Sequence, residues 1–99
     1  MLNITMKPEG SKLTVALEGR LDTATAPQLE EQLKAQIGSV TELVLDFEAL
    51  EYISSAGLRV LLSAQKIMNR QGSMKIMHVN EVIREVFDVT GFSDILTIE

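Results

Sequence analysis

The chain has 99 residues, of which 45% are hydrophobic and 23% are charged, a composition that is typical of one globular domain and excludes intrinsic disorder. Fourteen acidic residues against nine basic ones give a net charge of −5, and only 4% of the residues are aromatic, which excludes a DNA- or RNA-binding protein. With no cysteine and a single histidine, His78, the chain lacks a disulfide framework, a thiol nucleophile and an ordinary zinc site, and we expect no cofactor.

The N-terminal segment shows no sign of export. It lacks the basic start and apolar core of a signal peptide, and no later apolar run approaches the roughly 18 residues of a membrane-spanning helix. We therefore expect a single cytoplasmic domain over residues 1–99 that does not insert into a membrane.

Two strands are predicted at the N-terminus. Apolar and polar residues alternate over residues 2–7 and again over residues 13–18, as they do in strands with one buried face. The segment Pro8–Ser11 between them supplies a proline that fixes φ and a glycine that permits positive φ. This pattern is typical of a β-hairpin.

The next predicted element is a helix over residues 26–37. Its apolar residues recur every three or four positions, which places them on one face. Thr25 and Gln28 have the spacing of a capping box, and Pro27 is tolerated because the first helical turn has no internal N–H partner to lose. Gly38 is placed to end the helix.

Strands and helices then alternate to the end of the chain. Residues 43–47 are almost all apolar, as expected for a central strand, and the helix that follows has a broad apolar surface closed by Gly72. Asn80 is a preferred cap for the last helix, which Thr90 and Gly91 stop. The predicted elements after the first helix are strand 43–47, helix 55–70, strand 73–76, helix 81–90 and strand 95–98.

This order of elements predicts an α/β fold. Repeated strand–helix–strand units form parallel sheets with right-handed crossovers, so the hairpin adds one antiparallel strand to a mixed, mostly parallel sheet. If the strand order advances one way across the sheet, the helices pack mainly on one face.

The segment around Ser54 and Ser55 is the first candidate for chemistry. Both hydroxyls stand at the start of a helix, where free N–H groups and the helix dipole favour an oxygen or a phosphate. Simple helix capping by serine, with Gly57 allowing close packing, explains the same residues. An esterase-type nucleophile needs a glycine where Ile53 stands, and no phosphate-binding glycine loop occurs, so an enzyme is not expected.

A second candidate segment runs from Gly19 to Leu29 and contains Asp22. In a parallel sheet it lies at the same carboxyl edge as the Ser54–Ser55 segment, where open α/β sheets place their ligands and partners. Asp22 and Ser55 are therefore candidates for one shared surface. Asp22 also fits the role of a turn or cap acid, and the sequence alone slightly favours that role.

Three segments together resemble a known family. GRLDTATAPQL, LVLDFEALEYISSAGLRVLL and the stretch from Val82 to Phe92 look like the bacterial anti-sigma-factor antagonists, whose domain is shared with sulfate transporters and called STAS. The likeness runs the length of the chain and implies one STAS-like domain over residues 1–99.

The resemblance also implies a mechanism. In that family the anti-sigma factor is a serine kinase that phosphorylates a serine at the start of the second helix, and a metal-dependent phosphatase of the PP2C type removes the phosphate. Alignment on Gly57 and Leu58 places that serine at Ser55; Ser54 and Ala56 replace the Asp and Ser or Thr that flank it in many members. The implied partner-binding residues are Asp22, Thr23, Thr25, Ser54, Ser55, Gly57, Leu58 and Arg59.

Two other functions stay open at this stage. The chain could be a constitutive scaffold or interaction subunit of a signalling or lipid-transport assembly, in which Ser55 is only a helix cap. A weak nucleotide-binding module ranks last because no phosphate-cradling loop is present. The sequence leaves open whether the protein forms a homodimer.

Overall fold

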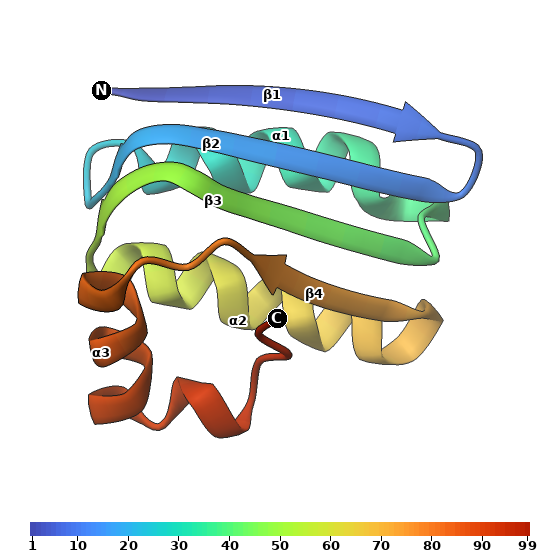
Figure 1. The fold of residues 1–99 in the computed structure, drawn as a ribbon. Helices are drawn as coiled ribbons and strands as arrows, with labels where there is room; N and C mark the ends of the chain where they lie inside the picture. The colour runs from blue at the N-terminus through green and yellow to red at the C-terminus, as the bar shows by residue number, and fades with distance from the viewer.

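The computed structural model describes residues 1–99, and its four strands form one mixed sheet in which spatial order follows chain order (Figure 1). The first two strands pair antiparallel, and the other two neighbouring pairs are parallel. The fold class predicted from the sequence is thus confirmed. The strands are β1 (Leu2–Glu9), β2 (Lys12–Leu21), β3 (Glu42–Ile53) and β4 (Ser73–Met77).

Three helices connect and follow these strands. Helices α1 and α2 lie side by side behind the sheet in Figure 1, and α3 lies beyond the carboxyl end of β4. Two short 3-10 helices complete the chain, at Ile37–Ser39 and Phe92–Asp94. The α-helices are α1 (Ala26–Gln36), α2 (Ser55–Gln71) and α3 (Glu81–Thr90). None of them combines the length and the apolar character that crossing a bilayer requires.

The core lies between the sheet and the helices. Alternate residues of the central strands β2 and β3 face inward, and Val15, Leu45 and Phe47 are completely buried. Phe87 of α3 packs against Phe47, with 6.5 Å between the ring centroids. Each such large side chain contributes about 1.5–3 kcal/mol by its burial, so the position of α3 is set by the core rather than by a loop.

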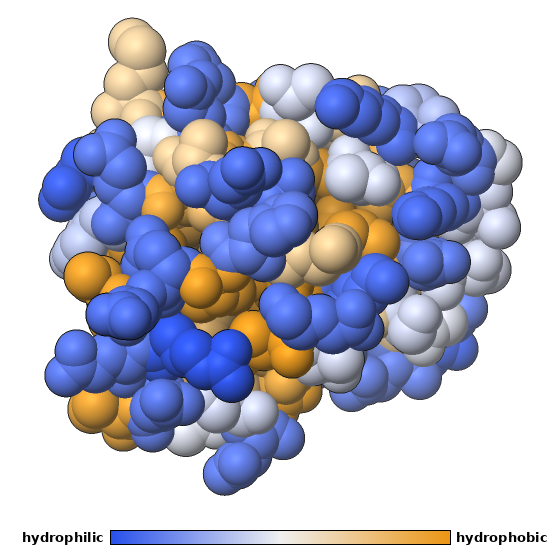
Figure 2. Space-filling view, viewed as in Figure 1, coloured by the Kyte–Doolittle hydropathy of each residue, from blue (hydrophilic) through white to orange (hydrophobic).

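The opposite face of the sheet carries no helix (Figure 1). Figure 2 shows this face as a surface of mostly hydrophilic side chains with smaller apolar areas between them. Along β2, buried and outward-facing residues alternate from Leu13 to Leu17, as the period of two in a β-strand requires, whereas residues 43–45 of the central strand β3 are all buried.

The hairpin turn is shorter than the sequence predicts. Pro8 lies within β1, and the turn consists of Gly10 and Ser11, with Gly10 at a positive φ of 60°. A proline fits there because β1 is an edge strand, whose outward N–H positions need no partner.

Two other boundaries differ from the prediction. β3 continues to Ile53, and Gly38 does not end the first helical segment but lies inside the 3-10 turn that follows α1. The predicted strand 95–98 is wrong, because only an isolated bridge between Ile76 and Ile98 forms. After the 3-10 turn at Phe92–Asp94, too few residues run alongside β4 to form a further β-strand.

Candidate functional site

The fold brings the two candidate segments together at the carboxyl edge of the sheet. Leu21 and Ile53 are the last residues of β2 and β3, and they are register partners in the parallel pair. The Ser54 N–H donates to the Leu21 carbonyl at 2.9 Å, so the two loops leave the sheet joined by a hydrogen bond. The expectation that Asp22 and Ser55 share an edge therefore holds.

Asp22 organises the loop between β2 and α1. Its Oδ1 accepts hydrogen bonds from the Ala24 N–H at 3.0 Å and the Thr25 N–H at 3.1 Å. The Thr25 backbone bond is the main reason that the pKa of Asp22 lies below its ordinary value, with smaller contributions from the Thr25 hydroxyl and the Ala24 N–H, while partial desolvation acts against them. Asp22 is thus an ionised turn residue, in line with the role that the sequence slightly favoured.

Thr25 is turned into the protein. Its hydroxyl donates to the Arg20 carbonyl at 2.8 Å and accepts from the Asp22 N–H at 2.9 Å. The predicted capping box does not form, because this hydroxyl is already engaged and the Gln28 amide points toward the Leu2 carbonyl. Thr25 is therefore a buried residue that stabilises the loop through hydrogen bonds, and it does not lie on the surface, where the sequence predicted that a partner would contact it directly.

The two serines at the start of α2 have different surroundings. Ser54 is the N-cap, and its Oγ accepts from the Gly57 N–H at 3.5 Å. Ser55 is the first residue of α2 and is exposed. Capping thus belongs to Ser54, and the Ser55 hydroxyl lies free at the positive end of the helix dipole.

Gly57 and Leu58 anchor the start of α2. Both are buried, and a Cβ at Gly57 would lie 2.8 Å from side-chain atoms of both Leu21 and Ile53. The helix therefore starts directly on the ends of β2 and β3. Like Thr25, these two residues position the surface rather than form it.

A shallow hollow of about 270 Å³ lies between the first turns of α1 and α2. Exposed Thr23 and Arg59 border it on its polar side, while Pro27 and Val60 contribute apolar surface. Of the residues expected to bind a partner, Thr23, Ser55 and Arg59 are exposed at or beside this hollow, while Asp22 and Ser54 are half-buried.

Sequence reasoning missed two residues at this edge, Arg20 and Tyr52. They are register partners on β2 and β3, and the Arg20 guanidinium lies 4.3 Å from the centroid of the Tyr52 ring. Arg20 Nε is also 4.0 Å from Asp22 Oδ2. Arg20 lies within the Gly19–Leu29 segment and Tyr52 lies two residues before Ser54, and these places were a usable signal, since exposed Tyr and Arg are enriched at the centres of protein interfaces.

No cluster of three or more metal-ligating side chains occurs at this edge. The cluster suited to metal binding consists of Asp46 and Glu48, within β3, and His78, which follows β4. The carboxyl edge offers hydroxyls, the carboxylates of Asp22 and Glu30, and two arginines, a set that fits protein recognition and phosphate chemistry.

Comparison with known proteins identifies similar sequences and similar structures. Residues 3–99 match the family model described as the STAS domain. BtrV of Bordetella bronchiseptica, described as a candidate anti-sigma factor antagonist, is 38% identical over 99 residues, covering 98% of this chain and 85% of that protein. The anti-sigma-B factor antagonist of Bacillus subtilis is 30% identical over 98 residues, covering 98% of this chain and 90% of that one.

Solved structures share the same architecture. An anti-sigma factor antagonist from Mycobacterium paratuberculosis superposes with a TM-score of 0.90 at 22% identity, covering 99% of this chain and 85% of the other. The Bacillus cell fate determinant SpoIIAA, in its phosphorylated form, gives a TM-score of 0.77 at 20% identity, covering 98% and 91%. At these identities the likeness establishes the fold.

Proposed function

The chain belongs to the STAS domain family, and from this premise we propose that it is an anti-sigma factor antagonist whose binding is switched by phosphate on Ser55. The observation that carries the proposal is the position of Ser55, exposed at the first residue of α2 and next to the Asp22 turn. The relatives described as anti-sigma factor antagonists support the class of partner.

In the unphosphorylated state the protein binds a serine-kinase anti-sigma factor through the carboxyl edge of the sheet. The rigid Asp22 turn and the start of α2 form the contact surface, with Thr23 and Arg59 at its hollow. Arg20 and Tyr52 extend this surface along β2 and β3. Binding occupies the anti-sigma factor and leaves its sigma factor free.

Phosphorylation reverses this state. The kinase transfers the γ-phosphoryl group of ATP to the Ser55 Oγ, which adds about −1.5 to −2 charges at neutral pH. This charge stands near the ionised Asp22 on a protein that already carries −5, so it repels an acidic partner surface and is costly to bury against an apolar one. A PP2C-type phosphatase resets the switch by hydrolysis.

The domain itself tolerates the phosphate. Negative groups within the first turn of a helix are stabilised by the helix dipole and by N–H groups that have no intrahelical partner. The modification therefore weakens the complex without unfolding the domain.

Mass spectrometry tests the site. The protein is incubated with ATP and the serine-kinase anti-sigma factor of the same organism, and the peptide containing Ser54 and Ser55 is sequenced. We expect phosphate on Ser55 in the wild type and in Ser54→Ala, and none in Ser55→Ala. Phosphate mainly on Ser54, or none with an active cognate kinase, contradicts the proposal.

A further inference from the structure

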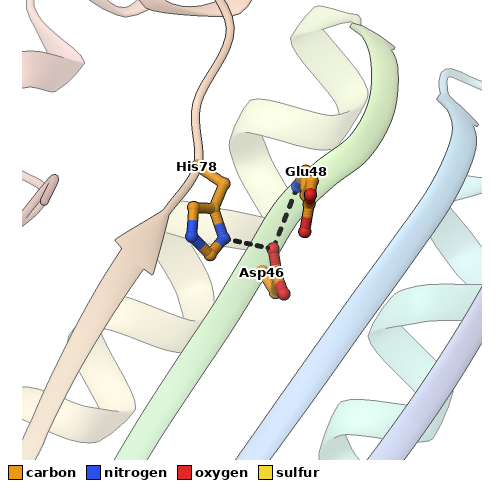
Figure 3. A group of neighbouring side chains, drawn as sticks. All are labelled: Asp46, Glu48 and His78. Carbon is orange, nitrogen blue, oxygen red and sulfur yellow. Dashed lines mark hydrogen bonds and ion pairs between the residues drawn. The ribbon is translucent and has the colours of Figure 1, made fainter.

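A second group of functional side chains lies on the open face of the sheet. Asp46 and Glu48 are two positions apart on β3, with buried Phe47 between them, so both project away from the core. His78 directly follows β4, the neighbouring strand, whose last residue Met77 is the register partner of Asp46. Figure 3 shows the His78 ring turned toward Asp46 across the two strands.

The spacing of these groups suits a common metal ion. His78 Nδ1 and Asp46 Oδ1 are 2.9 Å apart, and one ligand atom from each of the three residues lies within 4.8 Å of the others. Two neighbouring ligand atoms that each lie about 2.0–2.2 Å from one ion are about 2.8–3.6 Å apart in octahedral or tetrahedral geometry. The His78–Asp46 pair, which is a hydrogen bond in the structure, already has this separation. The metal ion takes the place of the proton between the two atoms, and that proton is released to solvent.

The backbone holds the pair in place. His78 adopts a left-handed conformation with φ of 61°, and its ring meets a carboxylate on the adjacent strand. The Glu48 N–H donates to Asp46 Oδ1 at 3.0 Å, which orients that carboxylate toward the ring (Figure 3). Groups of this kind that orient ligands raise the affinity of metal sites.

The face also provides room and charge. A shallow hollow of about 310 Å³ begins at Asp46 and Glu48 and extends over β2, where Glu18 lines it, to β1, where Asn3 lines it. An ion bound at its edge can keep several waters, since each takes about 30 Å³ of liquid volume. Lys7 places one positive charge near Asp46, which leaves the two carboxylates in excess.

From this geometry we propose that Asp46, Glu48 and His78 bind a divalent transition-metal ion of the Zn²⁺ type, one ion per chain. An imidazole nitrogen with two carboxylates suits Zn²⁺ or Ni²⁺, whereas Mg²⁺ and Ca²⁺ prefer oxygen ligands alone. The chain has no cysteine and no second histidine, so no other nitrogen or sulfur side chain of these classes competes for the ion. The proposal is independent of the role given to Ser55.

Calorimetric titration with ZnCl₂ and NMR of the imidazole ring test the site together. We expect one ion per chain and a shift of the ring nitrogens of His78, whose signals are unambiguous because it is the only histidine. Mg²⁺ at the same concentration is expected to leave the ring signals unchanged. A stoichiometry of one ion per two chains, or no ring shift at saturating Zn²⁺, overturns the proposal.

Matched variants separate the site from general binding by acidic side chains. His78→Asn removes the ring but keeps a residue type that tolerates positive φ, and Asp46→Asn removes one ligand charge. Each is expected to weaken Zn²⁺ binding by about tenfold or more. Asp94→Asn, which removes the same charge as Asp46→Asn but outside the cluster, is expected to leave binding unchanged. Circular dichroism verifies that each variant is folded. Unchanged affinity in folded His78→Asn overturns the proposal.

Discussion

Ser54 and Ser55 are adjacent hydroxyls with separate roles, and their contributions to stability are expected to differ. Ser54 caps α2, and the loss of such a cap typically costs about 0.5–2 kcal/mol. Because the bond from the Gly57 N–H to Ser54 Oγ is long at 3.5 Å, Ser54→Ala should lower the free energy of unfolding by about 1 kcal/mol or less. Ser55 is exposed, and Ser55→Ala should change stability by less than about 0.5 kcal/mol. Urea denaturation of both variants measures the difference. The reverse order would assign the cap to Ser55.

Asp22 combines a turn and a charge, which two substitutions separate. Asp22→Asn keeps an oxygen that can accept from the N–H groups of Ala24 and Thr25, whereas Asp22→Ala removes it. We expect the thermal midpoint at neutral pH to fall in the order wild type, Asn, Ala. If Asp22→Ala melts like the wild type, the turn does not depend on this side chain.

Because the pKa of Asp22 is lowered, the difference in stability between the wild type and Asp22→Asn should depend on pH. A carboxyl group whose pKa is lowered by folding stabilises the folded state at pH values above its ordinary pKa, here 3.8. This contribution disappears as the pH falls through the folded-state pKa. The advantage of the wild type over Asp22→Asn should therefore be constant near neutral pH and vanish in strong acid. Thermal melts between about pH 7 and pH 2.5 measure it. A constant difference over this range would show that the charge is not involved.

At the scale of elements, the start of α2 is fixed by its contact with the ends of β2 and β3. Gly57→Ala places a Cβ against Leu21 and Ile53, each 2.8 Å away, and overpacking of this kind costs about 1–3 kcal/mol. The higher helix propensity of alanine offsets at most about 1 kcal/mol of that cost. We expect a net loss of stability in urea denaturation.

Gly38→Ala is the matched control for that variant. No heavy atom lies within 4 Å of a Cβ at Gly38 and its φ is not positive, so the substitution should be neutral or slightly stabilising. If the two variants unfold alike, the helix does not start directly on the strands.

At the scale of the molecule, the proposed switch acts through charge on one edge. Ser55→Asp adds a negative charge near Asp22, whereas Ser55→Ala only removes a small hydroxyl. Binding to the serine-kinase anti-sigma factor should be weakened more by Ser55→Asp, by about tenfold or more, because a desolvated like-charge contact costs several kcal/mol. Titration calorimetry measures both affinities. Tight binding of Ser55→Asp would show that charge at this position does not control the partner.

The two proposed sites occupy different parts of the molecule. Ser55 and Asp22 follow the last residues of β3 and β2, whereas Asp46 and Glu48 lie within β3 on the face without helices. Zn²⁺ binding should therefore survive in Ser55→Asp, and partner binding in His78→Asn. The two proposals can fail separately.

Much of the fold and part of the site follow from the sequence alone. Alternation with a period of two identifies β1 and β2, and apolar spacing of three to four residues identifies α1, α2 and α3, because these periods are fixed by backbone geometry. The order of the elements determines a mixed, mostly parallel sheet, and that sheet places the Asp22 and Ser55 segments on one edge. Three local segments were enough to indicate the family.

Other features depend on contacts between residues far apart in the chain, and only the tertiary structure decides them. Ser54 rather than Ser55 became the cap because its N–H is held by Leu21 of the neighbouring strand. His78 meets Asp46, 32 positions earlier, only because β3 and β4 pair in one register and His78 takes a positive φ. A local pattern gives each strand its buried face, but the pairing of strands that are distant in the chain depends on how the whole core packs, and one segment alone does not contain that information.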